Sequence, residues 1–272
     1  MQISTKLFNQ QTLDRLSDMH GKIQQNQARI ATGKNILKAS DDPIAAVNIS
    51  AAKEQKTENA RYIENIGRAK SKLELSENAL NQASNLITRI YELTILAEND
   101  TFSVADRVAM KQEVTQLKDS MFEIVNSEDA SGQALFAGYK VNQNAFSRDE
   151  NGYIQYMGDR GNNVVNISEN MTLSLGIDGA SAFLRVPSEN RHKSVFGIIE
   201  AIEDNFEDAN FPKNAISDLQ SAIDHLSLQQ TYLGAQLNKA ELQEEALNKR
   251  QIILSENLSQ LEDADITKIV TE

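Results

Sequence analysis

The strongest pattern in the chain is a heptad repeat in its first half. Apolar and small residues recur at alternating spacings of four and three, which is the seam of a coiled-coil helix. Asp42 followed by Pro43 is typical of an N-cap and a first helical residue, so we expect one helix from Pro43 to about Glu98. The seam positions are Tyr62, Ile66, Ala69, Leu73, Ser76, Leu80, Ala83, Ile87, Ile90, Thr94 and Ala97.

A second seam of the same period lies near the C-terminus, after an interruption at Asn210-Phe211-Pro212. It continues to about Leu261, so the two seams are similar in length. Two long stripes of equal period predict an antiparallel pair of helices that bury each other's apolar faces. The expected contacts bring Leu73, Leu80, Ile87 and Ile90 against Leu219, Ile223, Leu226 and Leu233.

Two further helices have weaker signals. Ser103 and Asp106 have the spacing of a capping box, which predicts a helix that begins there after a break at residues 99–102. The first 30 residues carry an irregular apolar stripe that is rich in glutamine. Because short helices of this kind are marginal without a partner, we expect residues 1–40 and about the last 20 to be mobile in the monomer.

The segment from Gly132 to Gly179 has a different character, since it holds most of the chain's 12 glycines and several aromatic residues. Asn151-Gly152 precedes an alternating run that ends at Tyr156, which favours a hairpin with a type I′ turn. Residues 164–167 and 173–175 predict further short strands. The polar segment from Pro187 to Lys193 marks the return to helix.

The predicted fold is mainly α with a β insert, a long antiparallel helical-bundle rod that carries a small β-rich outer region. Low glycine and proline content and a mean hydropathy of −0.45 agree with an elongated helical chain. The predicted parts are an N-terminal segment (1–42), a helical rod domain (43–131 and 190–250), a β-rich insert (132–189) and a C-terminal segment (251–272).

Charge and hydropathy narrow the choice of partners. The chain has 27 basic and 39 acidic residues and a net charge of −12, which disfavours a nucleic-acid groove lined by Lys and Arg. No stretch approaches the run of about 20 apolar residues that a bilayer span needs, so we expect no membrane insertion. Polar residues interrupt the N-terminus throughout, so a cleaved secretory signal is not expected either.

The sequence offers no catalytic or ligand-binding motif. Cysteine is absent, which excludes disulfides and thiolate chemistry. Gly33-Lys34-Asn35 lacks the earlier glycine and the Ser or Thr of a phosphate-binding loop, and Asp41-Asp42 fits helix capping better than acid-base chemistry. The three histidines are isolated, without a second metal ligand at helical spacing. We therefore expect no enzyme, no cofactor and no metal site.

Two of the motifs near the ends of the chain resemble the flagellin superfamily. The first leads from Gly33 into Ser40-Asp41-Asp42-Pro43, and the last joins Leu233-Gly234-Ala235 to Glu262-Asp263-Ala264-Asp265. Between them, Asp106-Arg107 with Glu113 is similar to the second helix of that family. These motifs occur in order along nearly the whole chain.

A further motif discriminates within the superfamily. Leu135-Phe136-Ala137-Gly138 with Tyr156-Met157-Gly158-Asp159 is more similar to the hook-associated members than to filament flagellins, and so is Pro43. The resemblance therefore implies a structural protein that connects hook to filament through coiled-coil packing of its subunits. A filament flagellin is the near alternative, and a soluble coiled-coil signalling or dimerisation module is a distant one.

The same resemblance implies partners and a location. The expected partners are another hook-associated protein, flagellin, further copies of the chain in a ring, and a cytoplasmic export chaperone. The chain would be secreted through the flagellar type III apparatus after a transient cytoplasmic stage. Relatives continue for some tens of residues beyond the last motif, so the resemblance also predicts a natural chain longer than 272 residues.

We expect the assembly contacts at the motif residues. Asp42 should cap the long helix, whereas Asp41 has no intrahelical role and should be free to contact a neighbouring subunit or the opposing terminal segment. The candidates are Gly33, Ser40, Asp41, Asp42, Pro43, Leu233, Gly234, Ala235, Asp263, Ala264 and Asp265.

Overall fold

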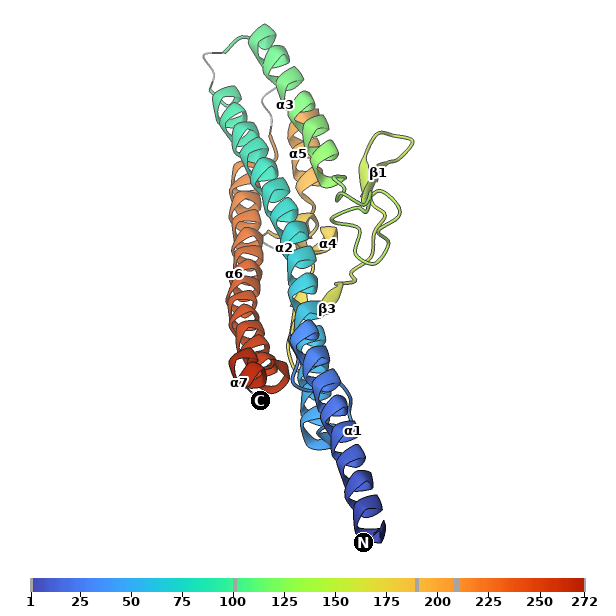
Figure 1. Cartoon of the computed structure of the whole chain (residues 1–272). Helices are drawn as coiled ribbons and strands as arrows, with labels where there is room; N and C mark the ends of the chain where they lie inside the picture. The colour runs from blue at the N-terminus through green and yellow to red at the C-terminus, as the bar shows by residue number, and fades with distance from the viewer. Residues whose placement is uncertain (1, 100–101, 189–190, 208–210, 272) are drawn as a thin grey trace. The chain divides into compact units, whose positions relative to one another are not determined.

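The structure is a computed structural model that describes residues 2–99, 102–188, 191–207 and 211–271. In these ranges the chain is mainly helical with a small antiparallel strand region, as predicted (Figure 1). The helices are α1 (Gln2–Thr32), α2 (Pro43–Ala97), α3 (Val104–Val125), α4 (Gly179–Phe183), α5 (Val195–Asp204), α6 (Ala215–Glu262) and α7 (Ile266–Thr271). The strands are β1 (Phe146–Arg148), β2 (Ile154–Tyr156), β3 (Val164–Asn166), β4 (Thr172–Ser174), β5 (Val186–Pro187) and β6 (His192–Lys193).

The chain divides into two compact units. The first unit holds Met1–Arg61 and Ala246–Glu272, and the second holds Tyr62–Glu245. Helices α2 and α6 contribute residues to both units. The division into four parts that the sequence predicts stays a prediction.

Side-chain caps fix the starts of the two central helices. Asp42 Oδ1 accepts the N–H groups of Ile44 (3.0 Å) and Ala45 (2.9 Å), and α2 then runs to Ala97, close to the predicted end. Ser103 and Asp106 form the expected capping box at the start of α3. Hydrogen bonds from the Ser103 hydroxyl and N–H lower the pKa of Asp106. Both helix starts were therefore predictable from local sequence.

The core of the second unit follows the predicted seams. Leu73, Leu80, Ile87 and Ile90 of α2 are fully buried, and so are three of the four expected positions of α6, Leu219, Leu226 and Leu233. The fourth expected position was wrong, because Ile223 is only half-buried and Ala222 occupies the core instead. Residue 223 lies at the edge of the buried stripe, since seven successive helical residues advance by slightly less than two full turns.

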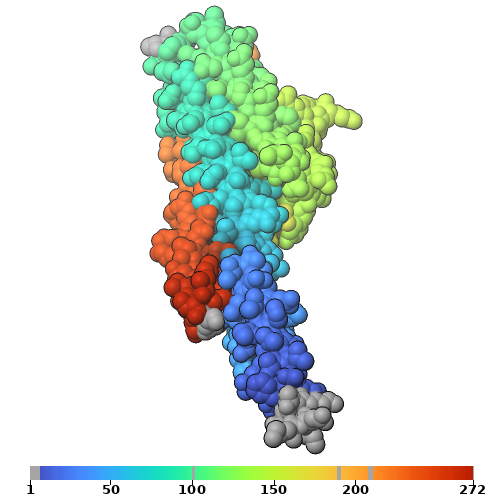
Figure 2. Space-filling model, viewed as in Figure 1, coloured from blue at the N-terminus to red at the C-terminus, as the bar shows by residue number. Residues whose placement is uncertain are grey.

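Within the described residues, the strands form three separate two-stranded antiparallel pairs, β1–β2, β3–β4 and β5–β6. The first two pairs confirm the predicted strand positions. Figure 2 shows that the segment after α3, coloured yellow-green, covers one flank of the α2 and α3 helices in the second unit. Short elements that the sequence did not predict are α4 and the β5–β6 pair. The β5–β6 pair occupies the polar segment that was expected only to return the chain to helix.

The predicted turn type between β1 and β2 was wrong. Arg148 pairs with Ile154, and the Asp149 N–H donates to Tyr153 O, so the loop is longer than a two-residue type I′ turn. Asp149 Oδ1 accepts the N–H groups of Asn151 and Tyr153 (both 2.9 Å), and Gly152 has a φ of 85°. A β-turn followed by a left-handed glycine is the usual form of a three-residue hairpin loop. The aspartate side chain thus selects the longer loop.

Candidate assembly site

The first unit brings the two terminal motifs together through the backbone. Gly33, with a φ of 69°, ends α1 in the left-handed conformation that favours glycine. Its carbonyl accepts the Ala264 N–H (2.9 Å), the Asn35 N–H donates to Glu262 O (2.8 Å), and Lys34 and Asp263 form an antiparallel bridge. We call residues 33–35 with 262–264 the terminal clasp.

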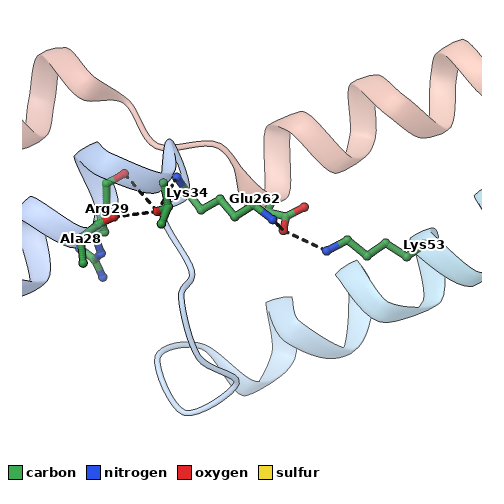
Figure 3. A network of polar contacts seen from close by, with 6 residues as sticks. Ala28, Arg29, Lys34, Lys53 and Glu262 are labelled. Carbon is green, nitrogen blue, oxygen red and sulfur yellow. Dashed lines mark hydrogen bonds and ion pairs between the residues drawn. The ribbon is translucent and has the colours of Figure 1, made fainter.

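Two lysines add charge to the terminal clasp. Glu262 Oε1 lies 2.5 Å from Lys34 Nζ and 2.9 Å from Lys53 Nζ, and its side chain is 15% exposed (Figure 3). Hydrogen bonds from Lys34 and Lys53 lower the pKa of Glu262. The carboxylate therefore links the loop after α1, the first part of α2 and the end of α6 within one unit.

The lowered pKa gives a pH-dependent prediction. A carboxyl whose pKa is lower in the folded state stabilises the fold above its unfolded value, here 4.5, and this contribution is lost as the pH falls through the folded value. Both lysines are about half-exposed, so Glu262→Gln should lower the free energy of unfolding at pH 7 by only about 0.5–1 kcal/mol. Chemical denaturation at pH 7 and pH 3 should show this difference shrinking in acid.

The matched control is Glu256→Gln, which removes an exposed carboxylate from the same helix. This control should match the parent at both pH values. If Glu262→Gln lowered the free energy of unfolding equally at pH 7 and pH 3, the ion pairs of Glu262 with the two lysines could not be the cause.

The structure corrects the expectation that Asp41 is free. Asp41 Oδ2 accepts the N–H groups of Leu37 (3.1 Å) and Lys38 (3.0 Å), and the Asp41 N–H donates to Lys38 O (3.0 Å). Asp41 therefore closes the loop that leads into α2, while Asp42 caps the helix. Sequence reasoning missed this role because backbone N–H partners leave no motif of their own.

Both aspartates are expected to matter for stability. Asp42→Ala should lower the free energy of unfolding by about 1 kcal/mol through loss of the cap. Asp41→Ala should cost about 0.5–1 kcal/mol, because two loop N–H groups lose their acceptor. Thermal melting checks both variants, with Ser40→Ala as a control at a neighbouring exposed position. If Asp41→Ala melted at the same temperature as the Ser40→Ala control, the hydrogen bonds of Asp41 would not contribute to stability. Asp41 would then be free for a contact with another subunit, as the sequence predicted.

The other candidate residues have different surroundings. Pro43 is the first residue of α2, and Asp265 Oδ1 accepts the Lys268 N–H (3.2 Å) at the start of α7. Leu233 lies in the buried core of the second unit, whereas Ala235 is exposed and a Cβ added to Gly234 would meet open space. The structure thus joins Gly33, Asp263 and Ala264 in one contact, and Leu233-Gly234-Ala235 belongs to a separate unit.

The first unit also exposes large apolar side chains. Every side chain of residues 7–25 in α1 is exposed, so this part of the helix buries little of its apolar surface within the described chain. Exposed apolar side chains that gather on one surface are typical of an interaction site. The exposed large apolar residues of the unit are Leu7, Phe8, Leu13, Leu16, Met19, Ile23, Ile30, Ile44, Val47, Ile252, Ile253, Ile266 and Val270.

In the second unit, the motif of the β insert forms one interlocked structure. The Tyr156 hydroxyl lies 2.6 Å from Asp159 O and 3.0 Å from Phe136 O, and burial is the main cause that raises the pKa of Tyr156 to about 12. Asp159 Oδ1 accepts the N–H groups of Tyr139 and Gly161 (both 2.8 Å), which lower its pKa. The two halves of the motif, 20 residues apart, therefore hold each other in place.

The described residues offer no group of three or more His, Asp or Glu side chains that could hold a metal ion. None of the described helices combines the length and the apolar character that a membrane span needs. The described chain is mainly helical, and backbone hydrogen bonds join its terminal motifs. Apolar side chains are exposed in the first unit, and the β insert of the second unit has its own buried centre.

The chain belongs to the bacterial flagellin family. The model of the flagellin N-terminal helical region matches residues 3–141, and that of the C-terminal helical region matches residues 216–272. The flagellar hook-associated protein 3 of Escherichia coli (strain K12) is 23% identical, with 97% of this chain and 89% of that protein covered. The Salmonella typhimurium protein of the same name is also 23% identical, covering 100% of this chain and 91% of that protein.

Solved structures share the fold. A putative flagellar hook-associated protein from Vibrio parahaemolyticus superposes with a TM-score of 0.72 at 20% identity, covering 82% of this chain and all of that one. The hook-associated protein-3 of Legionella pneumophila gives a TM-score of 0.73 at 18% identity, covering 78% and 98%. The chain therefore shares its fold with these two solved structures.

Proposed function

We propose that this chain is a structural, non-enzymatic subunit of the bacterial flagellum that joins the hook to the filament. The observation that carries this proposal is the interlocked motif of the β insert, where Tyr156 and Asp159 hold the segment around Phe136. Its residues resemble the hook-associated members rather than filament flagellins. The full-length match to two proteins named hook-associated protein 3 supports the same role.

The proposed mechanism is mechanical. Neighbouring subunits would bury the exposed apolar side chains of α1, the start of α2 and the α6–α7 region, and this burial would supply the free energy of assembly. The neighbours would be another hook-associated protein, flagellin and further copies of the chain in a ring. The marginal terminal segments would stay mobile before assembly, which avoids premature polymerisation.

The proposed route to the flagellum follows from the same features. The chain would pass transiently through the cytoplasm, where an export chaperone would cover the C-terminal segment, and would then be secreted through the flagellar type III apparatus. The exposed Ile252, Ile253 and Val270 are apolar side chains that such a chaperone could shield. This protection would prevent self-association before export.

Filament flagellin remains the second candidate, and one observation favours it. Flagellin FlaB1 of Treponema pallidum is 24% identical over 98% of this chain and 86% of that protein, so filament proteins match nearly the same length. The membership in the flagellin family removes the support for a soluble coiled-coil signalling module.

Deletion of the gene in the source bacterium separates the two candidates. A junction protein should leave cells with hooks but no attached filaments, and flagellin should accumulate in the medium. The full-length gene should restore swimming, whereas a gene that lacks residues 1–30 should not. Loss of filament protein from both cell and medium, with an unchanged junction, would instead identify the chain as a flagellin.

A further inference from the structure

The second unit contains a basic hollow that the assembly role does not use. The hollow has a volume of about 390 Å³ and its wall brings together three separate segments of the chain. Arg160 follows β2, and Ala180 and Leu184 come from α4 and its C-cap. Arg185 immediately precedes β5, and His192 is the first residue of β6. Two arginines and a histidine therefore line one space together with two apolar residues.

The arginines of this hollow are not neutralised by the described part of the chain. Arg160 and Arg185 form no hydrogen bond or ion pair with any described side chain, although the chain has 39 acidic residues against 27 basic ones. By contrast, Arg148 in the same unit lies 2.6 Å from Asp119. Cations that stay unpaired in an acidic protein are available to an anionic ligand.

A second hollow shares the lining residue His192 with the first. It has a similar volume of about 390 Å³, and its described wall includes Arg191, Lys193 and Asp218. Asp218, its one carboxylate among the described lining residues, forms an ion pair with Lys193 and accepts the Ser188 hydroxyl at 2.8 Å. Lys193 therefore balances the charge of this carboxylate, and Arg191 leaves a net positive charge among the described residues that line the second hollow.

We propose that the hollow lined by Arg160, Arg185 and His192 binds an oxyanion group, phosphate or sulfate, on a small molecule or on a polymer that also reaches the second hollow. A guanidinium presents paired N–H donors that match the oxygens of such a group. Arg160 and Arg185 belong to different segments of the chain, so each could donate to a different oxygen of the anion. The space exceeds that of the bare anion, so Ala180 and Leu184 can contact the group that carries it. The proposal does not depend on the junction role.

Histidine resonances offer a direct test because the chain has three histidines, at positions 20, 192 and 225. Inorganic phosphate is titrated into the full chain at pH 7, with ionic strength held constant by chloride. The ring signals of His192, assigned through His192→Gln, should shift and saturate, while those of His20 should stay in place. Arg185→Gln should raise the dissociation constant at least fivefold, and the double variant with Arg160→Gln should abolish saturation.

Arg15→Gln is the control, since it removes the same charge from α1 in the other unit. This variant should bind phosphate as the parent does. Linear shifts of equal size at all three histidines, or equal affinity in Arg185→Gln and Arg15→Gln, would overturn the proposal.

A second arm distinguishes the source of the oxyanion. Polyphosphate that binds at least tenfold more tightly per phosphate than the free ion would indicate a polymer that spans both hollows. Equal affinity per phosphate would indicate a small molecule. If neither inorganic phosphate nor polyphosphate gave a saturating shift of the His192 ring signals, the hollow would not be an oxyanion site.

Discussion

Replacing Gly138 by alanine should destabilise the β insert far more than the same replacement at Gly152. Both glycines have left-handed φ values, 72° and 85°, so the backbone strain of a new Cβ is similar and costs about 1 kcal/mol. At Gly138 the added Cβ would also overlap Asp159 Oδ1 and lie 2.5 Å from the Asp159 carbonyl oxygen. At Gly152 it would meet open space.

We therefore expect Gly138→Ala to lower the free energy of unfolding by about 3 kcal/mol or more, and Gly152→Ala by about 1 kcal/mol. Chemical denaturation gives both values, and the Tyr156 ring signals report whether the interlock is intact. If both variants lost the same free energy of unfolding, the close approach of Asp159 to Gly138 would not contribute to the stability of the β insert.

Leu80→Asp should have the largest effect on the second unit. Leu80 is fully buried in the seam of α2, so the variant loses an apolar contact and leaves a carboxylate without a partner. The expected cost is about 4 kcal/mol or more, which lowers the melting temperature by several degrees.

Leu75→Asp serves as the matched control. Leu75 is on the same helix but is 40% exposed, and its replacement should cost less than about 1 kcal/mol. The seam assignment would be wrong if Leu80→Asp melted within about 2 °C of Leu75→Asp.

Elements set by local chemistry were predictable from the sequence. Asp42 and Pro43 mark the start of α2, and Ser103 with Asp106 marks the start of α3. A cap and a heptad seam act within a few turns of one helix, so the sequence window that carries the signal also contains its cause. Leu73, Leu80, Ile87 and Ile90 are buried for the same reason.

The contacts of the candidate site were not predictable in the same way. Lys34 and Glu262 are 228 positions apart, and no local pattern pairs one particular lysine with one particular glutamate. Asp41 escaped detection because its partners are backbone N–H groups. The loop after β1 was misjudged because the Asp149 side chain, outside the Asn-Gly pair, sets its length.

The two units differ in how completely they bury their apolar residues. The second unit has a closed core that includes Leu80 and Leu226, whereas the first unit leaves Leu7, Phe8 and Leu13 more than half exposed. Folding of the second unit therefore buries the apolar seam residues of that unit. The first unit, by contrast, still exposes apolar side chains that a partner could bury. We expect variants of the second unit to change stability and variants of the exposed α1 surface to change assembly.

The position of the chain along the flagellum tests the proposed junction role most directly. An epitope inserted after Asn151, in the exposed loop between β1 and β2, should leave the buried centre of the insert intact. Immunogold electron microscopy of flagella from cells that carry this tagged chain should show one cluster of label per flagellum, at the boundary of hook and filament. Label distributed along the whole filament would contradict the junction role and identify the chain as a filament subunit.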